Sequence, residues 1–146
     1  MNLRGIIAGI AVVVSGCGPP ASTPEDLPRP DYDEFVSEVQ PILAQRCANP
    51  SCHGATSRPF SVYAAEAHRR DKSRVFYDEA LSEGELRANY DRARSFVVDG
   101  GTGPLLLVKP LAEEAGGIRH GDGEDVFMSP SEREYRIIED WIEGGR

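Results

Sequence analysis

Apolar residues recur at helical spacing in three stretches of the chain. The first stretch contains four of them, Phe35, Val39, Ile42 and Leu43. A capping box at Asp31-Tyr32-Asp33-Glu34 precedes this stretch and predicts a helix that runs up to Cys47. Pro41 interrupts the pattern, so we expect the helix to kink there or to restart with Pro41 in its first turn.

Two further stretches follow capping boxes of the same kind, at residues 82–85 and 131–134. Their apolar residues are Leu86, Tyr90, Ala93, Phe96 and Val97 in one, and Tyr135, Ile138, Trp141 and Ile142 in the other. Residues 64–77 are also predicted to be helical, whereas the apolar run at residues 105–108 fits either a strand or a buried helical turn. Residues 116–123 form a glycine-rich loop. The pattern as a whole indicates an all-α fold.

The first residues are typical of an export signal. Residues 1–16 carry one positive charge and then an apolar run that is too short to span a bilayer comfortably. Val14-Ser15-Gly16-Cys17 resembles the bacterial lipobox, which implies cleavage before Cys17 and lipidation of that residue. The alternatives are an ordinary signal peptide with an incidental cysteine, or a buried apolar segment. We expect an exported bacterial lipoprotein, anchored to a lipid membrane and facing the periplasm or the cell exterior.

Residues 17–30 are rich in proline and poor in apolar side chains, which predicts a tether. Residues 31–146 then remain for one modest domain. The chain is acidic, with 24 Asp plus Glu against 16 Lys plus Arg, which argues against binding to nucleic acid or directly to an anionic membrane surface. An acidic surface serves either solubility or docking to a basic patch on a partner protein.

The most informative segment contains two thiols and a histidine. Cys47 and Cys52 are followed directly by His53. Covalent haem attachment requires this order, because two thiols can bond the two vinyl groups while the adjacent imidazole binds the iron from one face. The usual attachment motif has two residues between the cysteines and this chain has four. The alternative is a Cys47–Cys52 disulfide with an incidental histidine, as expected for an exported protein.

Haem iron in electron-transfer proteins usually takes a second ligand, for which the chain offers three candidates. His120 lies among glycines that would let the backbone come close to a flat cofactor, although such a histidine is often only a surface residue. Met128 is its rival, with a role in core packing as the alternative. His68 lies in a charged segment and is expected to be solvated.

Residues 35–54, 116–123 and 135–145 together resemble the small planctomycete-type cytochrome c domains of exported bacterial proteins. The resemblance covers the chain from about Tyr32 onward. It implies a small, all-α, cytochrome c-like domain around one covalently bound haem c. In such a domain Cys47 and Cys52 attach the haem and His53 is an axial ligand of its iron.

These observations predict a membrane-tethered, single-haem electron carrier that works between redox partner proteins. A different class of protein is a lipid-anchored binding or scaffolding module with a Cys47–Cys52 disulfide and no haem. A zinc site made of Cys47, Cys52, His53 and His120 ranks last, because adjacent ligands are awkward for one tetrahedral ion. Enzymatic activity such as peroxide reduction would require the second iron ligand to be absent or labile.

Overall fold

A computed structural model describes residues 27–99, 101–121 and 125–144. Within these ranges the chain forms helices and turns, with isolated β-bridges and no strand, so the all-α prediction is confirmed at this level. The predicted signal peptide and Cys17 lie outside the described residues. In the part that is described, no helix is both long enough and apolar enough to cross a membrane.

The first predicted helix forms with a change of helix type in its middle. It consists of α1 (Tyr32–Glu34), the π-helical turn η2 (Phe35–Val39) and α2 (Gln40–Arg46). Asp31 caps it, because its carboxylate accepts the Glu34 N–H at 2.7 Å. Pro41 lies in the first turn of α2, where its missing N–H is tolerated, and the π turn directly before it widens the helix. The interruption predicted at Pro41 therefore takes the form of a π turn.

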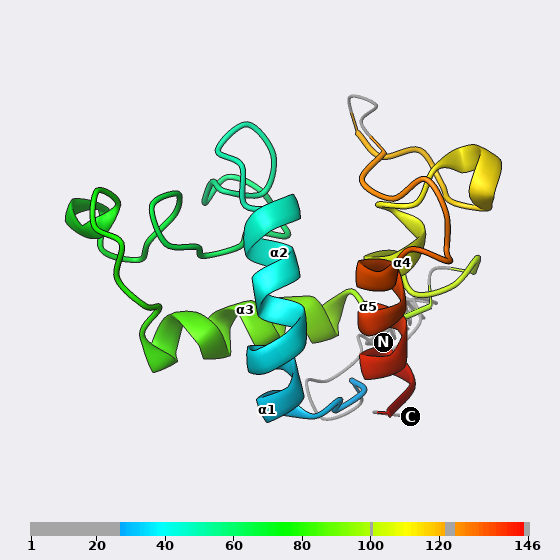
Figure 1. Cartoon of the computed structure of the whole chain (residues 1–146), viewed down its shortest axis with the longest axis horizontal. Coiled ribbons are helices and arrows are strands. Elements are labelled where there is room, and N and C mark those ends of the chain that lie inside the picture. Colours follow the sequence, from blue (N-terminus) through cyan, green and yellow to red (C-terminus); the bar gives the residue numbers. More distant parts are fainter. Residues whose placement is uncertain (1–26, 100, 122–124, 145–146) are drawn as a thin grey trace, which may run out of the picture.

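The core lies where this helix meets α3 (Glu83–Ser95) and α5 (Arg133–Gly144). In Figure 1, the helix made of α1, η2 and α2 stands beside α5 and runs antiparallel to it, in contact through η2, and α3 crosses the first of these two helices. Phe35 contacts both Tyr90 and Trp141, with ring centroids 5.6 and 5.4 Å apart. The C-terminal end of α2 and the N-terminal end of α5 consequently lie at the same end of the molecule.

The predicted capping boxes have different outcomes. The box at Ser82 and Glu85 is complete, with both reciprocal hydrogen bonds present. Helix α5 begins at Arg133, and the Glu132 carboxylate accepts the Ser129 N–H at 3.2 Å, so the hydrogen bond at its start is made by Glu132 and not by Glu134. Glu134, the predicted capping acid, instead forms an ion pair with Arg46 at the end of α2.

The helix predicted over residues 64–77 is wrong. Ala64 and His68 form a tight bridged turn in which Glu66 has a positive φ of 56°, and only the 3-10 turn η3 (Lys72–Arg74) follows. Tertiary contacts overrule the helical propensity of the alanines here. The undecided run is helical: it forms α4 (Leu105–Val108), and the 3-10 turn η4 (Glu113–Ala115) comes after it.

The last residues of the predicted tether pack on the domain. Pro30 is fully buried, and its carbonyl accepts the Tyr90 hydroxyl at 2.6 Å. Arg94 of α3 donates to the Pro28 carbonyl at 3.1 Å. The folded part of the chain therefore includes residues 28–30 as well as the predicted domain.

Candidate functional site

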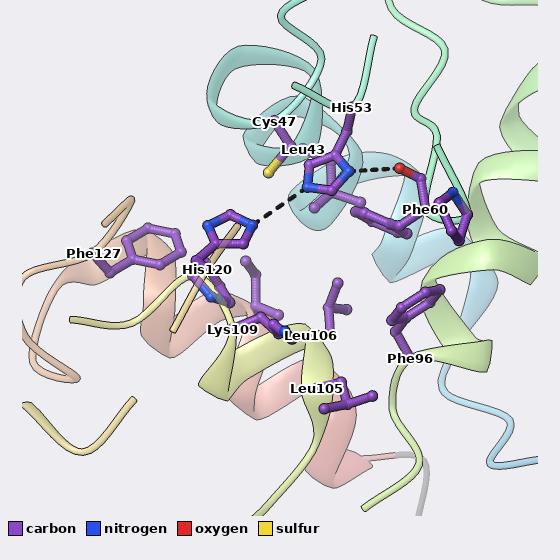
Figure 2. Close-up of a pocket in the computed structure, with 13 residues that line it drawn as sticks. Leu43, Cys47, His53, Phe60, Phe96, Leu105, Leu106, Lys109, His120 and Phe127 are labelled. Carbon is purple, nitrogen blue, oxygen red and sulfur yellow. Dashed lines mark hydrogen bonds between the residues drawn. The ribbon is translucent and has the colours of Figure 1, made fainter. Parts of the chain in front are cut away.

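Two loops at one end of the molecule enclose an apolar cavity. One loop follows α2 and carries His53, and the other lies between α4 and α5 and carries His120 (Figure 1). The volume of this His53–His120 cavity is about 200 Å³. Its walls are Leu43, Cys47, His53, Pro59, Phe60, Phe96, Leu105, Leu106, Lys109, Pro110, His120, Phe127 and Ile138, most of them drawn and labelled in Figure 2. Helices α2, α4 and α5 contribute to it, as does Phe96, the residue directly after α3 (Glu83–Ser95).

The two imidazole rings face each other across this cavity. Their Nε2 atoms lie 3.5 Å apart, and the rings are nearly parallel, with an interplanar angle of 17° and centroids 5.7 Å apart (Figure 2). Transition metal ions bind imidazole nitrogen at about 2.0–2.1 Å, so two nitrogens on opposite sides of one ion lie ~4 Å apart. A small separation of the two loops would bring His53 and His120 to that spacing.

The loop after α2 folds the long spacer between the cysteines into a compact turn. The Cys52 N–H donates to the Asn49 carbonyl at 2.8 Å, and the His53 N–H donates back to the Cys47 carbonyl at 3.0 Å. Gly54 is needed for this path, because a Cβ there would lie 2.1 Å from the Ala48 carbonyl oxygen. The turn keeps the backbone of Cys47 next to that of His53.

The orientation of the His53 ring directs Nε2 toward His120 Nε2. The Nδ1–H of His53 donates to the Phe60 carbonyl at 2.6 Å, since the carbonyl can only accept. Burial lowers the pKa of His53, and the nearby His120 and Arg58 lower it further, against the opposing effect of the Phe60 hydrogen bond. A neutral imidazole with its second nitrogen bonded to a backbone carbonyl is the usual form of a metal-binding histidine.

Side chains support the segment that holds His53. Each carbonyl of residues 60–63 accepts a hydrogen bond from a side chain: His53 at Phe60, Arg92 at Ser61, His68 at Val62, and Gln40 together with Asn89 at Tyr63. The Val62 N–H also donates to the His53 carbonyl at 2.8 Å. The Phe60 carbonyl that orients His53 is therefore part of an extended segment fixed by α2 and α3.

A tight backbone contact positions the His120 loop. The Gly117 N–H donates to the Ala112 carbonyl at 3.0 Å, and a Cβ at residue 117 would lie 1.8 Å from the Leu111 carbonyl oxygen. The Ile118 N–H donates to the Val108 carbonyl at the end of α4. This wrapped loop leads directly to His120. Gly117 is thus required for close packing of the chain against its own backbone, whereas the expected approach of this loop to a flat cofactor stays a prediction.

The two cysteines differ in their surroundings. The Cys47 side chain points toward the cavity, and burial, followed by the nearby Cys52, raises the pKa of its thiol to about 12 (Figure 2). Cys52 is exposed and does not line the cavity. Both thiols are free in the structure.

The other candidate ligands lie elsewhere. Met128 is 67% exposed and does not line the cavity, whereas its neighbour Phe127 is buried in the cavity wall. His68 is not solvated as predicted: it is 8% exposed, and its ring packs on Tyr63 with centroids 4.7 Å apart. Its Nδ1–H donates to the Val62 carbonyl at 3.0 Å, and its buried Nε2 has no hydrogen-bond partner among the described residues.

The aromatic walls of the cavity were only partly predictable. Phe96 belongs to the apolar pattern that predicted α3, but Phe60 lies in a loop without periodicity and carried no signal in the sequence.

The zinc set considered from the sequence is not assembled, because no group of three or more His, Cys, Asp or Glu side chains among the described residues is arranged to hold a metal ion.

The cavity combines two facing imidazole nitrogens, one thiol and apolar or aromatic walls. These donors suit an iron porphyrin, which needs axial nitrogen ligands, a thiol at its edge and an apolar enclosure. Comparisons with protein family models, curated proteins and solved structures found no match to this chain.

Proposed function

We propose that this chain is a single-haem c-type cytochrome that carries electrons between redox partner proteins. The observation that carries the proposal is the pair of imidazole Nε2 atoms, 3.5 Å apart across an apolar cavity whose wall includes the Cys47 thiol. His53 and His120 would be the axial ligands. Cys47 would attach the porphyrin from the cavity wall, and Cys52, which is exposed and does not line the cavity, would have to turn toward the ring to form the second bond. When bound, the haem supplies reversible one-electron oxidation and reduction of its iron.

The protein's own contribution is to hold the ligands and exclude water. The Phe60 carbonyl keeps His53 in the tautomer that presents Nε2, and the apolar walls lower the local dielectric around the iron. Two histidine ligands would leave no open iron position for a substrate. This arrangement favours electron transfer over peroxide reduction, so we propose a carrier rather than an enzyme.

The proposal includes the cellular setting expected from the sequence. Lipidation at Cys17 would anchor an exported protein to the membrane, and the proline-rich segment after it would connect the anchor to the domain. The domain has the all-α character expected of the planctomycete-type cytochrome c domains that the sequence resembles. The acidic composition suits docking to a basic surface on a redox partner.

The experiment that tests this function is a reduced-minus-oxidised absorption spectrum. The full chain is produced in a bacterial host with haem-attachment machinery and titrated through its redox range. We expect the sharp bands of a low-spin c-type haem that is oxidised and reduced reversibly by one electron. A protein purified without haem from such a host would contradict the proposal.

A further inference from the structure

The cavity wall contains one residue with a permanent charge. Of the 13 lining residues, all are apolar, aromatic or histidine except Cys47 and Lys109. Lys109 lies directly after α4 and is partly buried at the edge of the cavity. Its Nζ donates to the Arg119 carbonyl at 3.3 Å, and no carboxylate of the described residues forms an ion pair with it.

An anionic group on the ligand would stabilise the positive charge at this position. An ammonium carries three N–H donors, of which the long bond to Arg119 uses one. A charge beside an apolar wall is poorly solvated on that side, and a carboxylate from the occupant of the cavity would satisfy it. Haem carries two propionate carboxylates at one edge of an otherwise apolar ring.

We infer that Lys109 binds a carboxylate of the cavity's occupant, which is a haem propionate if the proposed function is correct. The ion pair fixes which edge of the ring lies against the end of α4. The positive charge also favours the reduced iron over the oxidised iron, because reduction lowers the positive charge of the haem centre. Lys109 thus acts as a binding residue that also raises the reduction potential.

Lys109 has a second link to the site through the loop. The carbonyl that it contacts belongs to Arg119, the residue directly before His120. If Lys109 had a purely structural role, its hydrogen bond would position this carbonyl and so keep His120 in place. Loss of such a role would change the ligation and spin state of the iron, whereas loss of the ion pair would change the potential and leave the iron low-spin.

The chain offers a matched control, because its only other lysine is Lys72. Lys72 lies in η3 and does not line the cavity. Lys109→Met and Lys72→Met therefore remove the same charge from the same chain, one at the cavity and one away from it. Lys109→Arg keeps the charge at the cavity.

The first measurement compares midpoint potentials and spin states of the holoproteins. We expect Lys109→Met to shift the equilibrium toward the oxidised form by about threefold to tenfold, which is a fall in potential of about 30–60 mV. The iron should stay low-spin, and Lys109→Arg and Lys72→Met should stay close to the wild type. Equal potentials for Lys109→Met and Lys72→Met would overturn the inference. High-spin iron in Lys109→Met, without a shift in potential that Lys109→Arg reverses, would also overturn it.

The second measurement separates this inference from the proposed function. The full chain is made in a host without haem-attachment machinery and titrated with haemin and with haemin dimethyl ester, which lacks the carboxylates. The wild type and Lys72→Met should bind the free acid about threefold to tenfold more tightly than the ester, and Lys109→Met should lose this preference. A preference that survives in Lys109→Met would overturn the Lys109 site alone. Failure of the wild type to bind either porphyrin would contradict both the site and the proposed function.

Discussion

The Nε2 atoms of His53 and His120 lie 3.5 Å apart, although 67 positions separate the two residues in the chain. The antiparallel packing of α5 and the helix that ends in α2 places the His53 loop and the His120 loop at the same end of the molecule. Each loop then relies on its own close backbone contact, at Gly54 in one and at Gly117 in the other. The helical core thus sets the distance between two potential ligands that belong to irregular segments.

Replacement of His120 should open one coordination position on the iron. His120 faces His53 across the cavity, whereas Met128 is exposed, so His120→Ala should give high-spin iron and Met128→Leu should leave the spectrum nearly unchanged. The wild-type protein should lack the near-infrared band of a methionine–iron bond. Absorption spectra of the oxidised proteins check this. High-spin iron in Met128→Leu, with low-spin iron in His120→Ala, would move the ligand role to Met128.

The Gly117→Ala substitution should destabilise the His120 loop. The new Cβ would lie 1.8 Å from the Leu111 carbonyl oxygen, so the backbone has to shift. We expect the free energy of unfolding to fall by about 1–3 kcal/mol, measured by denaturant titration. Gly144→Ala is the control, since a Cβ there meets no atom within 4 Å. Equal stabilities of the two variants would show that the close contact at Gly117 is not required.

Among the residues that support the His53 segment, Asn89 should be one of those whose substitution lowers the free energy of unfolding most. It is 1% exposed and makes two hydrogen bonds of 2.8 Å with the backbone of Tyr63 and one of 2.9 Å with Gln40. Asn89→Ala leaves these buried partners unsatisfied and should lower the free energy of unfolding by about 2–4 kcal/mol. Asp91→Ala, on the exposed side of the same helix, should change it by no more than about 0.5 kcal/mol. Chemical denaturation of both variants distinguishes them, and a cost for Asn89→Ala no larger than that of Asp91→Ala would contradict the account.

The buried ion pair between Arg69 and Glu85 should make stability depend on acid pH. Burial alone would raise the pKa of Glu85, but hydrogen bonds from Arg69, from the Arg70 N–H and from Ser82 lower it to about 2. Because the folded-state pKa lies below the unfolded value, this contribution is complete above pH ~4.5 and is lost as the pH falls toward ~2. We expect the free energy of unfolding to fall by about 2 kcal/mol over this range.

Two glutamine variants can show which carboxyl group makes the stability depend on pH. Glu85→Gln should lower the stability at neutral pH and flatten its dependence between pH ~4.5 and ~2. Glu83→Gln removes an exposed carboxylate that pairs with Arg87 in the same helix, and should leave the dependence nearly intact. Unfolding curves measured at several pH values provide the comparison. Parallel curves for the wild type and Glu85→Gln would show that Glu85 is not the responsible group.

The elements that the sequence predicted correctly rest on local signals. Apolar spacing located the helices around Phe35, Tyr90 and Trp141, and the Ser82 capping box marked the start of α3. Chain order and residue chemistry alone also pointed to His53 and His120. Each of these signals lies within a few residues and does not depend on distant contacts.

The features that the sequence did not predict depend on distant contacts. The turn at residues 64–68 replaces a helix because His68 bonds to Val62, and no propensity scale contains that contact. Met128 was the alternative to His120 as second ligand, and its exposure was not predictable locally, because it depends on Phe127 facing the cavity. The role of Phe60 arises from its packing against Phe96, the residue directly after α3, with centroids 5.2 Å apart.

The central claim, a covalently bound haem in the His53–His120 cavity, is tested most directly by intact mass spectrometry. The full chain and its Cys47→Ser and Cys52→Ser variants are produced in a host with haem-attachment machinery, denatured and extracted with acidified organic solvent. We expect the wild type to keep the mass of one haem after extraction and each variant to show weakened attachment. A wild-type chain without this mass, with Cys47 and Cys52 joined in a disulfide, would contradict it.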